Sequence, residues 1–385
     1  MPPPVAALPV DRLPEGVRAR FVDGVNGLRL HLLEAGWREP GRPLVLLLHG
    51  FPELAFSWRR IIAPLAALGF HVIAPDQRGY GRTTGWDPDY DGDLAPFRML
   101  NLVRDAIGVV SALGRREVAA VVGHDFGSPV AAWCGLLRPD VFRKVVLMSA
   151  PFPGPPTLPF DTDRSPPAPA APFLETLAVG LAALPRPRKH YQAYYCTREA
   201  AGDMERAPQG LGAFLRAYYH VKSADWPENR PHPLASWAPE QIARLPAYYV
   251  MDLDRGMAAT AAEHAPSAAA AEGRRWLTEA DLAVYAGEFA RTGFQGGLQW
   301  YRAQREPRFV AELQTFSGRA IDVPSCFIAG ARDWGVHQAP GSLDRMRSAA
   351  CTDLRGVHMV EGAGHWVQQE QPAAVIAHLQ AFLAG

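Results

Sequence analysis

The sequence predicts an α/β protein, in which a mostly parallel sheet is flanked by helices and a second, helical lobe is inserted into the chain. Short apolar runs alternate with longer amphipathic stretches up to about residue 150, and again after about residue 304. That alternation is typical of parallel strands joined by helices. The residues between these two parts have helical patterns and many aromatic side chains, which indicates a cap over the sheet.

The first part of the core is predicted over residues 1–150. Its predicted strands are the apolar runs RARFVDG, LRLHLLEAG, PLVLLLHG, HVIAPD, VAAVVGHD and KVVLMSAP. Helical patterns lie near residues 54–68, 99–113 and 127–138. Each run is short and bounded by turn residues or a helical pattern, as expected of strands in a covered sheet.

A boundary between core and cap is predicted at Pro151. Residues 151–172 contain nine prolines, and proline supports neither the interior of a helix nor a strand ladder. We therefore expect the cap at 151–304 and the rest of the core at 305–385. That last part contains the strand patterns VPSCFIAGARD and LRGVHMVEGAGH and a closing helix, PAAVIAHLQAFLAG. The long cap stretch 221–276 has no role that the sequence assigns.

Composition excludes several classes of protein. Lys+Arg and Asp+Glu both number 39, without long runs of one sign, so no nucleic-acid footprint is indicated. Four scattered cysteines fit neither a zinc cluster nor a disulfide framework. The N-terminus lacks a signal-peptide pattern, and no run approaches about 18 apolar residues. We expect a soluble cytoplasmic protein that acts on a small hydrophobic molecule, without a membrane or nucleic-acid partner.

Three motifs that follow predicted strands point to nucleophilic catalysis. GHDFG, GARDWG and GAGHW place Asp125, Asp333 and His365 at strand ends, in the order nucleophile, acid, histidine. In GHDFG a sharp turn would lift Asp125 above the sheet, with glycines on both sides to relieve crowding. The stretch HGFPE follows the third strand. The backbone N–H groups of Phe51 and Phe126 are therefore predicted to form an oxyanion hole.

An aspartate at this turn, where serine is usual, indicates the type of reaction. A serine that opened an epoxide would form an ether, which water does not readily hydrolyse, whereas a carboxylate forms an ester. Asp125 needs no base to attack a carbon, because a free aspartate has a pKa of about 3.9. His365, oriented by Asp333, is then free to activate the water that hydrolyses the ester.

The stretches HGFPELAFSWR, DQRGYG, GHDFG, GARDWG and GAGHW resemble the soluble epoxide hydrolases of the α/β-hydrolase superfamily. The resemblance covers most of the chain. It implies an α/β-hydrolase core with a helical cap, and conversion of an epoxide and water to a vicinal diol through a covalent ester on Asp125. Motifs typical of phosphate or metal sites are absent, so no cofactor and no metal are expected.

The same family uses two cap tyrosines that hydrogen-bond the epoxide oxygen. The stretch HYQAYY resembles the first of these sites and implies Tyr191. The stretch LAVYAGEFARTGFQGGLQWYR resembles the second and implies Tyr285. Other tyrosines in or beside these stretches are less favoured alternatives, and these are Tyr194, Tyr195 and Tyr301.

Two other functions stay open at this point. A haloalkane or haloacid dehalogenase would use the same Asp, His and Asp, and Trp334 together with the cap tryptophans fits that alternative. The tyrosine pair favours an epoxide, because an alkoxide leaving group needs a proton donor and a halide does not. A catalytically silent receptor with this fold is the second alternative. The particular epoxide, the regiochemistry and enantiopreference of opening, and the oligomeric state stay open, with a homodimer as one candidate.

Overall fold

The computed structural model describes residues 5–158, 173–272 and 275–385. Its main sheet has eight strands in the order β1-β2-β4-β3-β5-β6-β9-β10. The pairs of β1 with β2 and of β2 with β4 are antiparallel, and the other pairs are parallel. The strands are β1 (Val17–Val25), β2 (Leu28–Ala35), β3 (Leu44–Leu48), β4 (His71–Pro75), β5 (Ala120–His124), β6 (Val145–Met148), β9 (Ser325–Gly330) and β10 (Leu354–Val360). This sheet confirms the predicted fold class.

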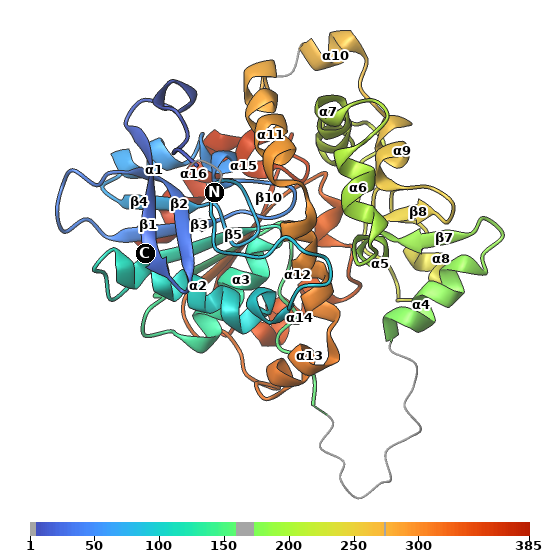
Figure 1. Ribbon diagram of the computed structural model, residues 1–385. Helices are drawn as coiled ribbons and strands as arrows, with labels where there is room; N and C mark the ends of the chain where they lie inside the picture. Colours follow the sequence, from blue (N-terminus) through green and yellow to red (C-terminus); the bar gives the residue numbers. More distant parts are fainter. Residues whose placement is uncertain (1–4, 159–172, 273–274) are drawn as a thin grey trace, which may run out of the picture.

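Helices flank the sheet, as Figure 1 shows. Strands β3 and β5 are buried at every position, which explains their unbroken apolar sequences. Helix α2 packs on α3, and α1 packs on α16. The core helices are α1 (Ile62–Ala67), α2 (Met99–Ala112), α3 (Gly127–Leu137), α13 (Pro307–Gln314), α14 (Ser342–Arg345), α15 (Val367–Glu370) and α16 (Pro372–Ala384). Short 3-10 and π turns are η1 (Val10–Arg12), η2 (Ala55–Trp58), η3 (Ala95–Phe97), η4 (Trp334–Val336) and η5 (Met346–Ala350).

A group of helices lies beside the sheet, coloured from green to orange in Figure 1. It includes a two-stranded antiparallel sheet of β7 (Arg188–His190) and β8 (Val250–Asp252). The helices are α4 (Phe173–Ala182), α5 (Tyr191–Tyr195), α6 (Glu199–Glu205), α7 (Leu211–Lys222), α8 (Pro239–Ile242), α9 (Met257–Ala262), α10 (Ala268–Glu272), α11 (Glu279–Thr292) and α12 (Gln295–Arg305). No helix in the described part of the chain is long and apolar enough to cross a membrane.

Local patterns differ from the structure in two places. The helix predicted near 54–68 is divided into η2 and α1, since Pro64 in the first turn of α1 has no N–H with which to continue a helix from the preceding residues. Between the two, the buried guanidinium of Arg59 bonds Asp281 and Gln369. The small β7–β8 sheet pairs segments far apart in the chain, so no local pattern indicated it. The predicted boundary stretch 151–172 lies mostly outside the described residues, and the exact domain limits stay a prediction.

Candidate active site

The candidate nucleophile occupies a strained turn between β5 and α3. Asp125 has a backbone φ angle of 51°, in the left-handed region that residues other than glycine rarely adopt. A Cβ on Gly123 would lie 2.0 Å from the carbonyl oxygen of Gly127, and a Cβ on Gly127 would lie 2.3 Å from that of Leu48. Glycine is therefore required on both sides, and the GHDFG pattern follows from this close packing.

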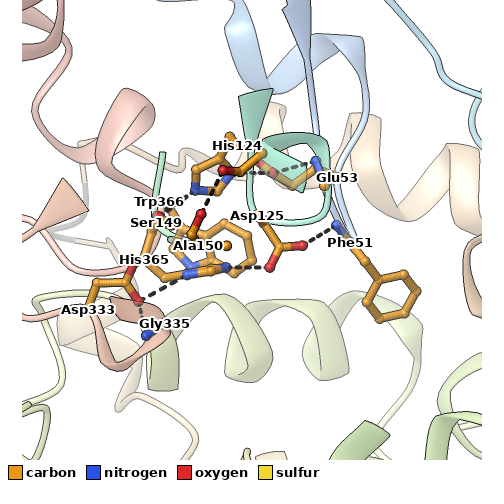
Figure 2. Close-up of polar contacts among 12 residues, drawn as sticks. Phe51, Glu53, His124, Asp125, Ser149, Ala150, Asp333, Gly335, His365 and Trp366 are labelled. Atoms are coloured by element: carbon orange, nitrogen blue, oxygen red, sulfur yellow. Dashed lines mark hydrogen bonds and ion pairs between the residues drawn. The ribbon is translucent and has the colours of Figure 1, made fainter. Parts of the chain in front are cut away.

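The structure brings the three motif residues together. His365 Nε2 lies 3.3 Å from Asp125 Oδ2, and His365 Nδ1 lies 3.1 Å from Asp333 Oδ1. The backbone N–H of Gly335 donates to Asp333 Oδ1 at 2.7 Å. Figure 2 shows the imidazole between the two carboxylates. All three side chains are buried, so their mutual geometry is fixed by the surrounding protein.

The loop after β3 approaches the other oxygen of the nucleophile. The backbone N–H of Phe51 donates to Asp125 Oδ1 at 2.8 Å, as Figure 2 shows. A Cβ on Gly50 would lie only 2.3 Å from this oxygen, so glycine permits the approach. Phe126 directly precedes α3, and a contact of its N–H with a reacting oxygen stays a prediction. The two oxygens of Asp125 thus face different groups: one a backbone donor, the other the histidine.

Electrostatics keep the nucleophile ionised. Burial raises the pKa of Asp125, but the hydrogen bond and charge of His365, followed by the charge of Lys222, lower it well below its usual range. Burial and Lys222 lower the pKa of His365. Asp333 and the hydrogen bond to Asp125 outweigh them and raise it to about 9. At neutral pH the free site therefore holds an ionised carboxylate beside a protonated imidazole.

A cavity of about 410 Å³ opens over Asp125, and its wall includes Tyr191 and Tyr301. The hydroxyl of Tyr191, on α5, donates to Gln338 Oε1 at 3.0 Å. The two tyrosine rings lie 6.1 Å apart. Burial, and then the charge of Asp125, raises the pKa of both phenols well above its usual value. Both hydroxyls therefore stay protonated and can donate hydrogen bonds into the cavity.

Tyr285 departs from the prediction made for it. Its side chain is fully buried on α11, where the hydroxyl bonds Ser57 Oγ at 2.8 Å and Gln369 Oε1 at 3.2 Å. Tyr285 does not line the cavity over Asp125, whereas Tyr301 on the next helix does. The structure therefore brings Tyr191 but not Tyr285 to the nucleophile.

A sequence signal for Tyr301 was present in the glycine pair of FQGGLQWYR. A Cβ on Gly297 would lie 2.8 Å from the Phe51 ring and from the hydroxyl of Tyr80. A Cβ on Gly296 would lie 2.2 Å from the carbonyl oxygen of Gly79. Helix α12 can therefore lie directly against the core loops, which places the helix that carries Tyr301 next to the nucleophile.

The sheet, the strained turn and the buried Asp–His–Asp arrangement define a hydrolase of the α/β-hydrolase fold. A family model described as alpha/beta hydrolase fold matches residues 43–177. The chain is 34% identical over 372 residues to "Epoxide hydrolase A" of Mycobacterium tuberculosis, over 95% of this chain and 97% of that protein. The chain belongs to the epoxide hydrolase family of this fold.

Solved structures agree with that assignment. An epoxide hydrolase from an endophytic Streptomyces matches with a TM-score of 0.72 and 34% identity, over 97% of this chain and 96% of that chain. A mutant of the epoxide hydrolase from Solanum tuberosum matches with a TM-score of 0.72 and 28% identity, over 96% and 99% of the two chains. The similarity thus includes the cap as well as the core.

Proposed function

We propose that this protein hydrolyses an epoxide to a vicinal diol through a covalent ester on Asp125. The observation that carries the proposal is the position of the ionised Asp125 carboxylate, which lies in a cavity also lined by two phenols. His365 contacts the same carboxylate and is oriented by Asp333. These groups suffice for a reaction in two steps.

In the first step, a carboxylate oxygen attacks an epoxide carbon and the carbon–oxygen bond of the ring breaks. The Phe51 N–H donates to Oδ1 of Asp125, and Oδ2, which lies 3.3 Å from His365 Nε2, is the oxygen that we expect to attack. The epoxide oxygen leaves as an alkoxide, and Tyr191 and Tyr301 donate hydrogen bonds to it and supply its proton. The product of this step is an ester of Asp125 with a free hydroxyl on the neighbouring carbon.

After ring opening, the imidazolium of His365 gives up a proton, which offsets the proton that the phenols supplied to the alkoxide, so that both phenols are again protonated. In the second step, the neutral His365 takes a proton from water, and the oxygen of that water attacks the ester carbonyl. Negative charge develops on Oδ1 of Asp125, where the Phe51 N–H already lies and the Phe126 N–H is the predicted second donor. Asp333 stabilises the imidazolium that forms. The bond between the carbonyl carbon and Oδ2 of Asp125 then breaks. The departing oxygen takes a proton from the imidazolium, which regains one from the new carboxylic acid, and the diol leaves with the former Oδ2.

Neither alternative function has comparable support. Of the tryptophans that favoured a halide site, Trp334 is buried against the ring of His232 and does not line the cavity over Asp125. The cap residue Trp237 does line that cavity, but so do the phenols of Tyr191 and Tyr301, which a halide leaving group does not need. A silent receptor would not need a nucleophile, a base and its orienting acid in contact. The relatives and the solved structures reported above are epoxide hydrolases.

We further infer that the reaction needs no cofactor, since side chains and backbone N–H groups supply the nucleophile, the base and the donors. The substrate is expected to be a small hydrophobic epoxide, because aromatic and proline side chains make up much of the cavity wall.

The four cysteines are unpaired, which favours a reducing compartment such as the cytoplasm. A homodimer remains the candidate assembly.

Replacing the two cavity tyrosines is expected to slow alkylation. Tyr191→Phe and Tyr301→Phe should each reduce the single-turnover rate by about 10²-fold, because one donor to the alkoxide is lost, and the double variant should show no alkylation. Tyr285→Phe is the matched control and should stay near the wild-type rate. Rapid-quench measurement of ester formation tests this. If Tyr285→Phe lost most of its alkylation rate while Tyr301→Phe kept the wild-type rate, Tyr285 would be the second cap tyrosine, as the sequence predicted.

A second, apolar cavity predicts the shape of the substrate. It has a volume of about 250 Å³ and shares Phe126 and Phe152 with the wall of the catalytic cavity. An alkyl tail that enters it should raise kcat/KM by about fourfold per methylene, from about 0.8 kcal/mol of apolar burial. Val310→Trp should abolish this gain and spare short epoxides, whereas Ala311→Trp, at an exposed neighbour, should change neither. Measuring kcat/KM for a series of terminal epoxides with longer and longer alkyl chains tests this, since the prediction is the change in kcat/KM per added methylene.

A further inference from the structure

A buried lysine lies beside the catalytic residues. Lys222, the last residue of α7, is 3% exposed, and no carboxylate in the described part of the chain forms an ion pair with it. A buried ammonium needs other groups to offset the loss of water. Aromatic rings surround it instead. The distances from Nζ to the ring centres are 4.8 Å for Tyr249, 5.3 Å for Tyr218, 5.7 Å for Tyr248, 5.9 Å for Trp366 and 6.0 Å for Tyr191.

This aromatic cage is continuous with the active site. Tyr191 of the cage lines the cavity over Asp125, and Trp366 follows the catalytic histidine in the chain. The backbone N–H of His365 donates to the carbonyl oxygen of Lys222 at 2.8 Å. The charge of the ammonium lowers the pKa of both Asp125 and His365. Lys222 therefore acts on the same two groups that carry the proposed reaction.

The cap stretch without an assigned role holds this lysine in place. Tyr248 in the cage donates its hydroxyl to Asn229 Oδ1 at 2.8 Å. The amide of Asn229 in turn donates to the carbonyl oxygens of Val221 and Ser223, at 2.9 and 2.7 Å. These bonds fix the backbone on both sides of Lys222. The stretch thus carries both a cation and part of its cage to the catalytic histidine.

The charges around His365 change when Asp125 reacts. In the free site two carboxylates, Asp125 and Asp333, face two cations, the His365 imidazolium and the Lys222 ammonium. Alkylation removes the negative charge of Asp125. If only Asp333 then faced the imidazole, its negative charge would hold the proton on His365. The second step requires the opposite, because only a neutral imidazole can accept a proton from water.

We propose that Lys222 is a positioning residue for ester hydrolysis, whose ammonium balances the charge of Asp333 once Asp125 is esterified and so favours the neutral form of His365. The proposal rests on the two-step reaction proposed above. The groups that face the ammonium and the imidazole from the packed elements are Asp125, Asp333, His124, Tyr191, Tyr218, Tyr248 and Tyr249. Of these, Asp125 is the one whose charge the reaction removes.

The test is the pH dependence of ester hydrolysis in single-turnover experiments with Lys222→Met. Removing a positive charge stabilises the imidazolium, so the pKa of His365 in the ester should rise. The acid limb of the hydrolysis rate should therefore move to higher pH by on the order of one unit, the effect of one charge at short range in a partly polar site. At pH values below the limb, the rate of ester hydrolysis in the variant should be about tenfold lower than in the wild-type protein. Alkylation at neutral pH should change little, since Asp125 stays ionised.

Three further variants separate charge from structure. Lys222→Arg keeps the charge and should keep the wild-type limb. Lys189→Met removes another cap lysine, 4.7 Å from the Tyr194 ring, and should leave the profile unchanged. Lys222→Gln keeps a polar head in the cage and is measured beside Lys222→Met in case the latter does not fold. An acid limb at the wild-type pH in a folded Met or Gln variant overturns the proposal. Failure of the wild-type protein to form any ester would instead refute the proposed two-step reaction.

Discussion

Replacing His365 with glutamine is expected to stop the catalytic cycle after alkylation and to leave the substrate attached to the protein. Ring opening needs the Asp125 carboxylate and the cavity phenols, whereas ester hydrolysis needs a base. Loss of a general base slows its step by about 10²- to 10⁴-fold, so the ester should accumulate. Intact-protein mass spectrometry should show a gain of one whole substrate mass, located on the peptide that contains Asp125.

The size of the added mass also separates the functions considered for this fold. An epoxide adds its whole mass because the leaving oxygen stays on the adduct, whereas a haloalkane loses its halide. The double variant Asp125→Asn/His365→Gln is the control and should show no addition. A His365→Gln protein that is inactive yet unmodified would contradict the two-step reaction.

The Asp–His–Asp arrangement of the candidate site could be predicted because its signals are local. Asp125, Asp333 and His365 each follow a strand whose apolar run is visible in the sequence, and the carboxyl ends of parallel strands meet at one edge of a sheet. The glycines beside Asp125 are required by backbone contacts within the same turn and with the neighbouring strand. The order of the motifs along the chain was therefore enough to place these side chains together.

The cap could not be predicted to the same degree, because its signals depend on packing between distant segments. Tyr285 and Tyr301 lie on consecutive helices, and the contacts of α11 and α12 with the core decide which tyrosine faces the cavity. The glycine pair before Tyr301 is a signal in the sequence, but its meaning depends on the core loops that it contacts. Nothing in the sequence around Lys222 distinguishes it from a lysine at a solvated helix end. Its burial arises from Tyr248, Tyr249 and Trp366, which reach it from elsewhere in the chain.

The source of the new oxygen in the product is expected to be the protein in the first turnover. Water that attacks the carbonyl carbon of the ester leaves its oxygen on Asp125, and the diol departs with a former carboxylate oxygen. Direct attack of water on the epoxide gives the same diol with a solvent oxygen. The two routes therefore differ completely in where an isotopic label appears, although their products are chemically identical.

With enzyme in excess over substrate in oxygen-18 water, the first diol should be largely unlabelled, and the peptide that contains Asp125 should gain heavy oxygen. Label should enter the diol only when substrate is in excess and the same carboxylate reacts again. Incubating enzyme in oxygen-18 water without substrate is the control and should leave Asp125 unlabelled. Heavy diol from the first turnover would mean that Asp125 acts only as a base or a charge, and the contact of Phe51 N–H with Oδ1 would then have no oxyanion to stabilise. Because that backbone donor already contacts the carboxylate oxygen on which the charge would develop, we expect the label on the enzyme first.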